Sequence, residues 1–102
     1  MLPIEELLPL ADSFEMAMKD PAWQEVDEKW KKGVEGIHNQ LMNIFKNTGV
    51  TILNPVGEEF NPHEHEALMD SGTDNKVRDV IQKGYKLGDR IVRPAKVAIG
   101  SN

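Results

Sequence analysis

The sequence has 102 residues, 39% of them hydrophobic and 28% charged, proportions typical of one folded domain and too apolar for a disordered chain. Its formal net charge of -5 argues against a general nucleic-acid-binding protein, which usually presents a basic surface. Cysteine is absent, which excludes disulfides and thiolate metal ligands. No apolar run approaches the roughly 20 residues that span a bilayer, so we expect a soluble protein with neither a nucleic-acid nor a membrane partner.

The first part of the chain carries apolar residues at helical spacing. Pro9 interrupts this stripe and should kink or divide the helix, because proline lacks a backbone donor. Asp20 and Pro21 predict the start of a longer helix, as cap and first helical residue, and Gly49 predicts its end. The stripe consists of Ile4, Leu7, Leu8, Ala11, Phe14 and Met18.

The longer helix carries a seven-residue apolar repeat. Trp23, Trp30, Ile37 and Ile44 recur every seven residues, and a second set follows four residues after the last three of these, as in a coiled-coil seam. Two amphipathic helices form a layer too thin to bury both stripes, so we expect a dimeric four-helix bundle. The alternative is that the seam packs on the chain's own second half. The predicted dimer interface contains Trp30, Val34, Ile37, Leu41 and Ile44.

After Gly49 the pattern changes to short segments rich in β-branched residues, separated by Gly, Pro, Asn and Asp. We expect a small sheet of about four to six strands from this part. The fold class is therefore predicted to be α+β, with a helical dimerisation region at residues 1–48 and an all-β domain at 49–102. The candidate strands are VTIL, HEALM, VRDVIQ, DRIVR and AKVAI.

The stretch EFNPHEHEAL, residues 59–68, resembles a metal site because it holds two histidines among glutamates. His63 and His65 would share a face only on a strand, and zinc needs a third ligand that the stretch does not supply at a known spacing. Asn61 and Pro62 instead predict one helical turn that leads from Phe60 into a strand near residue 66. Paired carboxylates could in principle do acid–base chemistry, but no substrate-binding loop accompanies them. We therefore expect no catalytic residue, metal or cofactor.

Four strings in chain order point to a family: LLPLADSFEMAM, GVEGIHNQLMNIFKNTGV, EEFNPHEHEALM and VIQKGYKLGDRIVRPAKVAI. Together they resemble GrpE, the nucleotide exchange factor of the DnaK chaperone, from about Leu7 to Ile99. The string QKGYKLxDRxxRPAxV is the most specific part of the match. EFNPHEHEA is similar to the family's F-D-P-x-x-H-E-A junction between helical bundle and β-domain, with Asn61 where an aspartate is usual.

This resemblance implies a non-enzymatic homodimer with a four-helix bundle and two projecting β-domains, or wings. One wing would bind the nucleotide-binding domain of a DnaK-type chaperone, open its cleft and release ADP. The implied location is the bacterial cytoplasm, and the mitochondrial matrix is the less favoured alternative. The contact positions that the family implies are Phe60, Ile81, Arg90 and Ile99.

Two departures from the family stand out. Most of the long helix that precedes LLP in the family is missing from this sequence, and the loop at residues 70–76 is shorter and lacks P-G-T-V. Two other functions stay open: a small His/carboxylate metal enzyme, and a dimeric helical scaffold that binds an acidic protein through a basic β hairpin. The basic residues of that hairpin region are Lys83, Lys86, Arg90, Arg93 and Lys96.

Overall fold

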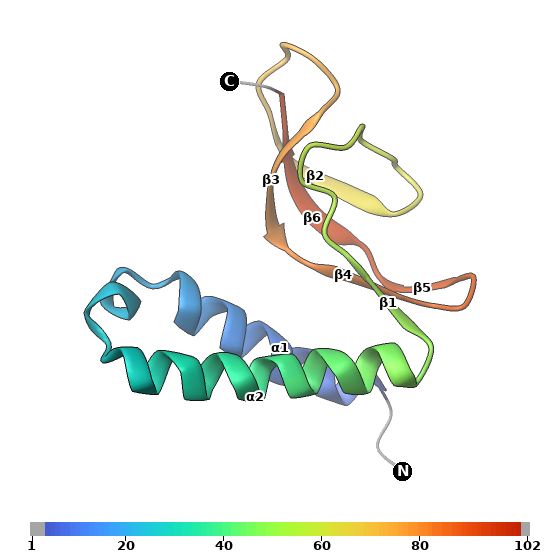
Figure 1. Cartoon of the computed structure of the whole chain (residues 1–102). Helices are drawn as coiled ribbons and strands as arrows, with labels where there is room; N and C mark the ends of the chain where they lie inside the picture. Colours follow the sequence, from blue (N-terminus) through green and yellow to red (C-terminus); the bar gives the residue numbers. More distant parts are fainter. Residues whose placement is uncertain (1–3, 101–102) are drawn as a thin grey trace. The chain divides into compact units, whose positions relative to one another are not determined.

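The computed structural model describes residues 4–100 of the chain (Figure 1). The chain divides into two compact units, Met1–Thr48, here called the helical unit, and Gly49–Asn102, here called the β unit. The helical unit contains α1 (Ile4–Lys19), the short 3-10 helix η1 (Pro21–Glu25) and α2 (Glu28–Asn47), and the β unit contains six strands. The predicted α+β class is confirmed.

Helix α1 runs through Pro9 without a break, so of the two predicted effects, a kink or a division, the division does not occur. A proline at this position removes one helical hydrogen bond. Leu8 and Ala11, on either side of it, are the buried residues of the helix. Because the stability of helices in proteins comes mostly from packing of an apolar face, these contacts can offset the missing bond.

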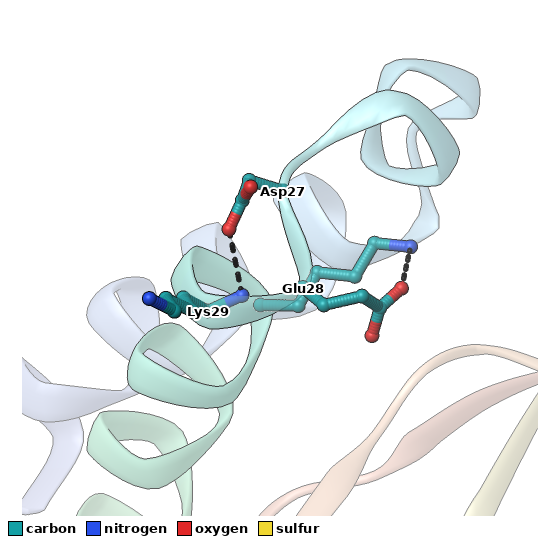
Figure 2. Close-up of polar contacts among 4 residues, drawn as sticks. Asp27, Glu28 and Lys29 are labelled. Atoms are coloured by element: carbon teal, nitrogen blue, oxygen red, sulfur yellow. Dashed lines mark hydrogen bonds and ion pairs between the residues drawn. The ribbon is translucent and has the colours of Figure 1, made fainter.

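The start of the long helix also differs from the prediction. Asp20 does act as a cap, since its carboxylate accepts from the backbone N–H of Ala22 at 2.8 Å, but it caps only η1. A second cap, Asp27, accepts from the N–H of Lys29 at 2.8 Å and starts α2 (Figure 2). Trp23 therefore lies in η1, outside the seven-residue repeat of α2. The helix ends at Asn47, and Gly49 has the positive φ of 86° that its predicted role as a stop requires.

The β unit forms two sheets rather than one. The first has the strand order β1-β4-β5 and is antiparallel, whereas the second has the order β2-β6-β3, in which β2 runs parallel and β3 antiparallel to the central β6. The sequence analysis missed β4. The bounds are β1 Val50–Leu53, β2 His65–Asp70, β3 Val77–Gln82, β4 Gly84–Leu87, β5 Arg90–Arg93 and β6 Ala95–Ile99.

The core of the β unit contains mainly valines from β3 and β6. The loop after β1 lies along the outer edge of β3, where the N–H of Gly57 donates to the Val77 carbonyl and the N–H of Phe60 donates to the Asn75 carbonyl, both at 2.8 Å. This edge pairing brings the Phe60 side chain onto the core. The core residues are Val77, Val80, Ala95, Val97 and Ile99.

Candidate functional site

The inner stripe of α2 packs on α1 within the same chain. Leu41 and Phe45 of α2 are buried, as are Leu8 and Ala11 of α1. A polar contact lies beside them, where His38 Nε2 is 2.9 Å from Glu15 Oε1. This stripe therefore forms the intrachain core of the helical unit.

The outer face of α2 carries a second apolar row, and this row is not covered. Trp30, Ile37 and Ile44 are 72%, 54% and 50% exposed, and their spacing of seven residues places them on one side of the helix. Leu41, by contrast, is only 7% exposed, and Val34 is half-buried. The predicted dimer interface thus splits into three residues on the open face and two that already pack inside the chain. The apolar arc of α2 is wider than one neighbouring helix can cover.

Two of the expected partner contacts are exposed on the β unit. Ile81, on β3, is 41% exposed. Arg90 is also exposed and begins β5, directly after the tight turn that joins β5 to β4. They belong to different sheets, Ile81 to the sheet of β6 and Arg90 to the sheet of β4.

The other two expected contacts lie deeper. Phe60 is half-buried, packs against the core and has its ring centroid 5.8 Å from that of His65. Ile99 is only 5% exposed, because it belongs to the central strand β6 and faces the core with Val97. The structure therefore does not present Ile99 as a surface contact.

The histidine-rich stretch forms a turn before β2. The Asn61 side chain accepts from the N–H of His63 at 2.9 Å, and the N–H of His65 donates to the Asn61 carbonyl at 2.8 Å. His65 is buried, and its Nδ1 accepts from the N–H of Asn61 at 2.9 Å, a bond that requires Nδ1 to carry no proton. The turn expected from Asn61 and Pro62 is present, and the strand that follows begins at His65, as the candidate strand HEALM predicted. Within residues 4–100, no three His, Asp or Glu side chains gather where they could hold a metal ion.

The basic residues around β4 and β5 are partly used inside the unit. Lys86 Nζ lies 3.0 Å from the Glu64 carboxylate, and Arg93 donates to the Lys83 carbonyl from Nε at 3.1 Å and from Nη2 at 2.6 Å. Neither contact was predicted from the sequence, where Lys86 and Arg93 were treated only as basic residues of the hairpin region. The Lys86–Glu64 ion pair leaves less positive charge for an acidic partner than the sequence suggests. In the described part of the chain, no helix combines the length and apolar character that crossing a membrane requires.

Comparison with known proteins matches almost the whole chain. The sequence model of the GrpE family covers residues 3–101. The protein GrpE of Listeria welshimeri is 38% identical over 99 residues, and that of Bacillus cereus strain AH820 is 39% identical over 100 residues. These alignments cover 93% and 94% of this chain but 52% and 53% of the relatives, so the chain spans about half the length of the relatives it matches. The family resemblance expected from the sequence is confirmed: the chain belongs to the GrpE family.

Proposed function

We propose that the chain acts as a nucleotide exchange factor for a DnaK-type chaperone. It binds the nucleotide-binding domain of the chaperone, holds the nucleotide cleft open and promotes ADP release, without catalytic residues or a cofactor of its own. Family membership supports this function. The observation that carries it is the exposure of Ile81 and Arg90, which both lie inside the family-like string VIQKGYKLGDRIVRPAKVAI.

In this proposal the β unit is the wing that contacts the chaperone. Ile81 supplies the apolar anchor of the interface, and Arg90 supplies a charge-assisted hydrogen bond to a carboxylate or carbonyl of the partner. Phe60 contributes the edge of its half-buried ring. Ile99 acts from the core by supporting this surface, because its side chain is buried.

The helical unit is proposed to form the homodimer. The open row of Trp30, Ile37 and Ile44 is the surface that a second copy would cover, giving four helices from two chains. Val34 and Leu41, which already pack inside the chain, would then line the interior of the same bundle. An exposed row of large apolar residues is typical of an interaction surface.

The proposed mechanism is an exchange of two ligands on one chaperone. If this protein binds the open cleft better than the closed one, and ADP binds the closed cleft better, each must weaken the binding of the other by the same factor. ADP is then released because the opened cleft has lower affinity for it. Because of this coupling, the function can be measured at equilibrium, as weaker chaperone binding in the presence of ADP, as well as from the rate of ADP release.

The test is the release of a fluorescent ADP analogue from the nucleotide-binding domain of a bacterial DnaK. We expect faster release with this protein, weaker chaperone binding when ADP is present, and loss of both effects in Arg90→Ala. Lys76→Ala, which removes an exposed positive charge elsewhere on the β unit, is the matched control. Binding without faster release would instead favour the dimeric scaffold. The relatives named above are bacterial, and the proposed site of action is the bacterial cytoplasm.

A further inference from the structure

The two sheets of the β unit are joined by two very short connections. Strand β3 leads into β4 through Lys83 alone, and β5 leads into β6 through Pro94 alone, so both chain segments change sheets within one residue (Figure 1). These connections are also in contact with each other. A Cβ atom added to Gly84 would lie 2.7 Å from the Arg93 carbonyl oxygen and from the Pro94 carbonyl carbon, and it would clash with the Ala95 nitrogen. Only glycine permits so close a crossing.

Arg93 connects the two segments at this crossing. Its Nε and Nη2 both donate to the Lys83 carbonyl, at 3.1 and 2.6 Å, which ties the end of β5 to the β3–β4 connection. The guanidinium also lies over the ring of Tyr85, with Cζ 5.2 Å from the ring centroid. Tyr85 is fully buried and lies on β4. One side chain therefore holds a backbone carbonyl and an aromatic ring at the place where the sheets meet.

Glu64 adds a second link across the same place. Its backbone carbonyl accepts from the N–H of Ala95, the first residue of β6, at 2.9 Å. Its carboxylate lies 3.0 Å from Lys86 Nζ on β4. The turn before β2 is thus tied to one strand of each sheet. We call the set of Glu64, Lys83, Gly84, Arg93 and Pro94 the sheet junction.

The sheet junction lies between the two exposed residues of the proposed wing surface. Ile81 is two residues before Lys83 on one sheet, and Arg90 is three residues before Arg93 on the other. A rotation of one sheet against the other would change the separation of Ile81 and Arg90. If this separation is fixed before binding, a rigid partner can engage both residues without the entropic cost of ordering the two sheets on binding.

We propose that Arg93 is a positioning residue that sets the orientation of the β4–β5 hairpin against the β2-β6-β3 sheet, so that Arg90 and Ile81 can bind the chaperone together. This inference rests on the proposed function. Arg93 does not itself touch the partner. It acts through the Lys83 carbonyl and the Tyr85 ring, and its effect on binding should therefore depend on Arg90.

The first arm of the test measures the junction without any partner. Because the chain has no cysteine, Asp89→Cys in the β4–β5 turn and Glu66→Cys on β2 give two specific spin-label sites. Labelled chains are mixed with an excess of unlabelled protein, so that each dimer holds one labelled pair. We expect a narrow distance distribution that broadens or shifts in Arg93→Ala and does so less in Arg93→Lys, which keeps one donor group. Lys76→Ala is the charge-matched control.

The second arm is a double-mutant cycle with the nucleotide-binding domain of DnaK. Arg93→Ala should weaken binding about tenfold in the unsubstituted chain, but much less in an Arg90→Ala background, because the contact that it positions is then gone. Equal losses in both backgrounds, or an unchanged distance distribution, would overturn the role of Arg93. If Arg93→Ala fails to fold, the same comparisons are made with Arg93→Lys. No binding by the unsubstituted chain would overturn the exchange function and this role in it, while the spin-label distances would still show whether Arg93 holds the sheets.

Discussion

Shortening Ile37 to alanine tests whether the open row on α2 is the dimer interface. Ile37 is 54% exposed in the single chain, and burying a whole isoleucine is worth about 1.5–3 kcal/mol. The exposed half then accounts for about 0.8–1.6 kcal/mol, and a symmetric dimer contains two copies, so Ile37→Ala should weaken dimerisation by about 1.6–3.2 kcal/mol. This loss corresponds to a rise of about 15- to 200-fold in the dimer dissociation constant.

The assay is sedimentation equilibrium over a range of protein concentrations. Val56→Ala is the matched control, because Val56 is 55% exposed and belongs to the β unit, which is not part of the proposed interface. The dissociation constant should rise for Ile37→Ala and stay unchanged for Val56→Ala. Equal dissociation constants for the two variants, or a monomeric unsubstituted chain throughout the micromolar range, would refute the assignment of this row to the dimer.

Three further outcomes follow from the packing. Phe45→Ala should cost about 3–5 kcal/mol in chemical unfolding of the helical unit, because Phe45 is fully buried between the helices. Gly36→Ala should stabilise α2 by about 0.5–1 kcal/mol, since no atom lies within 4 Å of an added Cβ. Gly84→Ala should instead destabilise the β unit, because backbone atoms lie 2.7 Å from the added Cβ. Thermal melts should therefore show a higher melting temperature for Gly36→Ala and a lower one for Gly84→Ala. In ¹⁵N NMR spectra His65 should show an unprotonated Nδ1, and a protonated Nδ1 would contradict its hydrogen bond with the Asn61 N–H. His65→Ala should lower the free energy of unfolding in chemical denaturation by about 1–3 kcal/mol, because the Asn61 N–H loses its acceptor.

The helical unit shows where a sequence pattern is sufficient and where it is not. The seven-residue repeat of Trp30, Ile37 and Ile44 correctly predicted one apolar row, because helical spacing alone decides which residues share a face. The cap at Asp27 was missed because Asp20 and Pro21 offer an equally good start a few residues earlier. Local capping signals do not reveal which of two starts the packing will favour. The placement of Leu41 against α1 likewise depends on a contact between helices that no single helix encodes.

In the β unit, residue patterns predicted five of the six strands but not their division between two sheets. Strand β4 was missed because its two neighbouring glycines, Gly84 and Gly88, resemble turn residues. Gly88 does have the positive φ of a turn residue, 59°, but Gly84 is buried in a strand for a different reason, the close crossing with the β5–β6 connection. Such a crossing joins residues ten positions apart and cannot be inferred from either segment alone. The burial of Ile99 follows from the central place of β6, which is likewise a property of the pairing.

The central place of β6 also has a consequence for the order of folding during synthesis. Among residues 4–100, β6 is the last of the six strands, yet β2 and β3 pair with it and not with each other. The β2-β6-β3 sheet therefore cannot form until Ala95–Ile99 has left the ribosome, whereas α1 and α2 can pair as soon as Asn47 has emerged. Contacts between distant segments form slowly, because the entropy of closing the intervening loop is lost before the contacts are gained. We expect nascent chains that end before β6 to have a folded helical unit and an exposed, unpaired β2, which would make them substrates for a chaperone themselves.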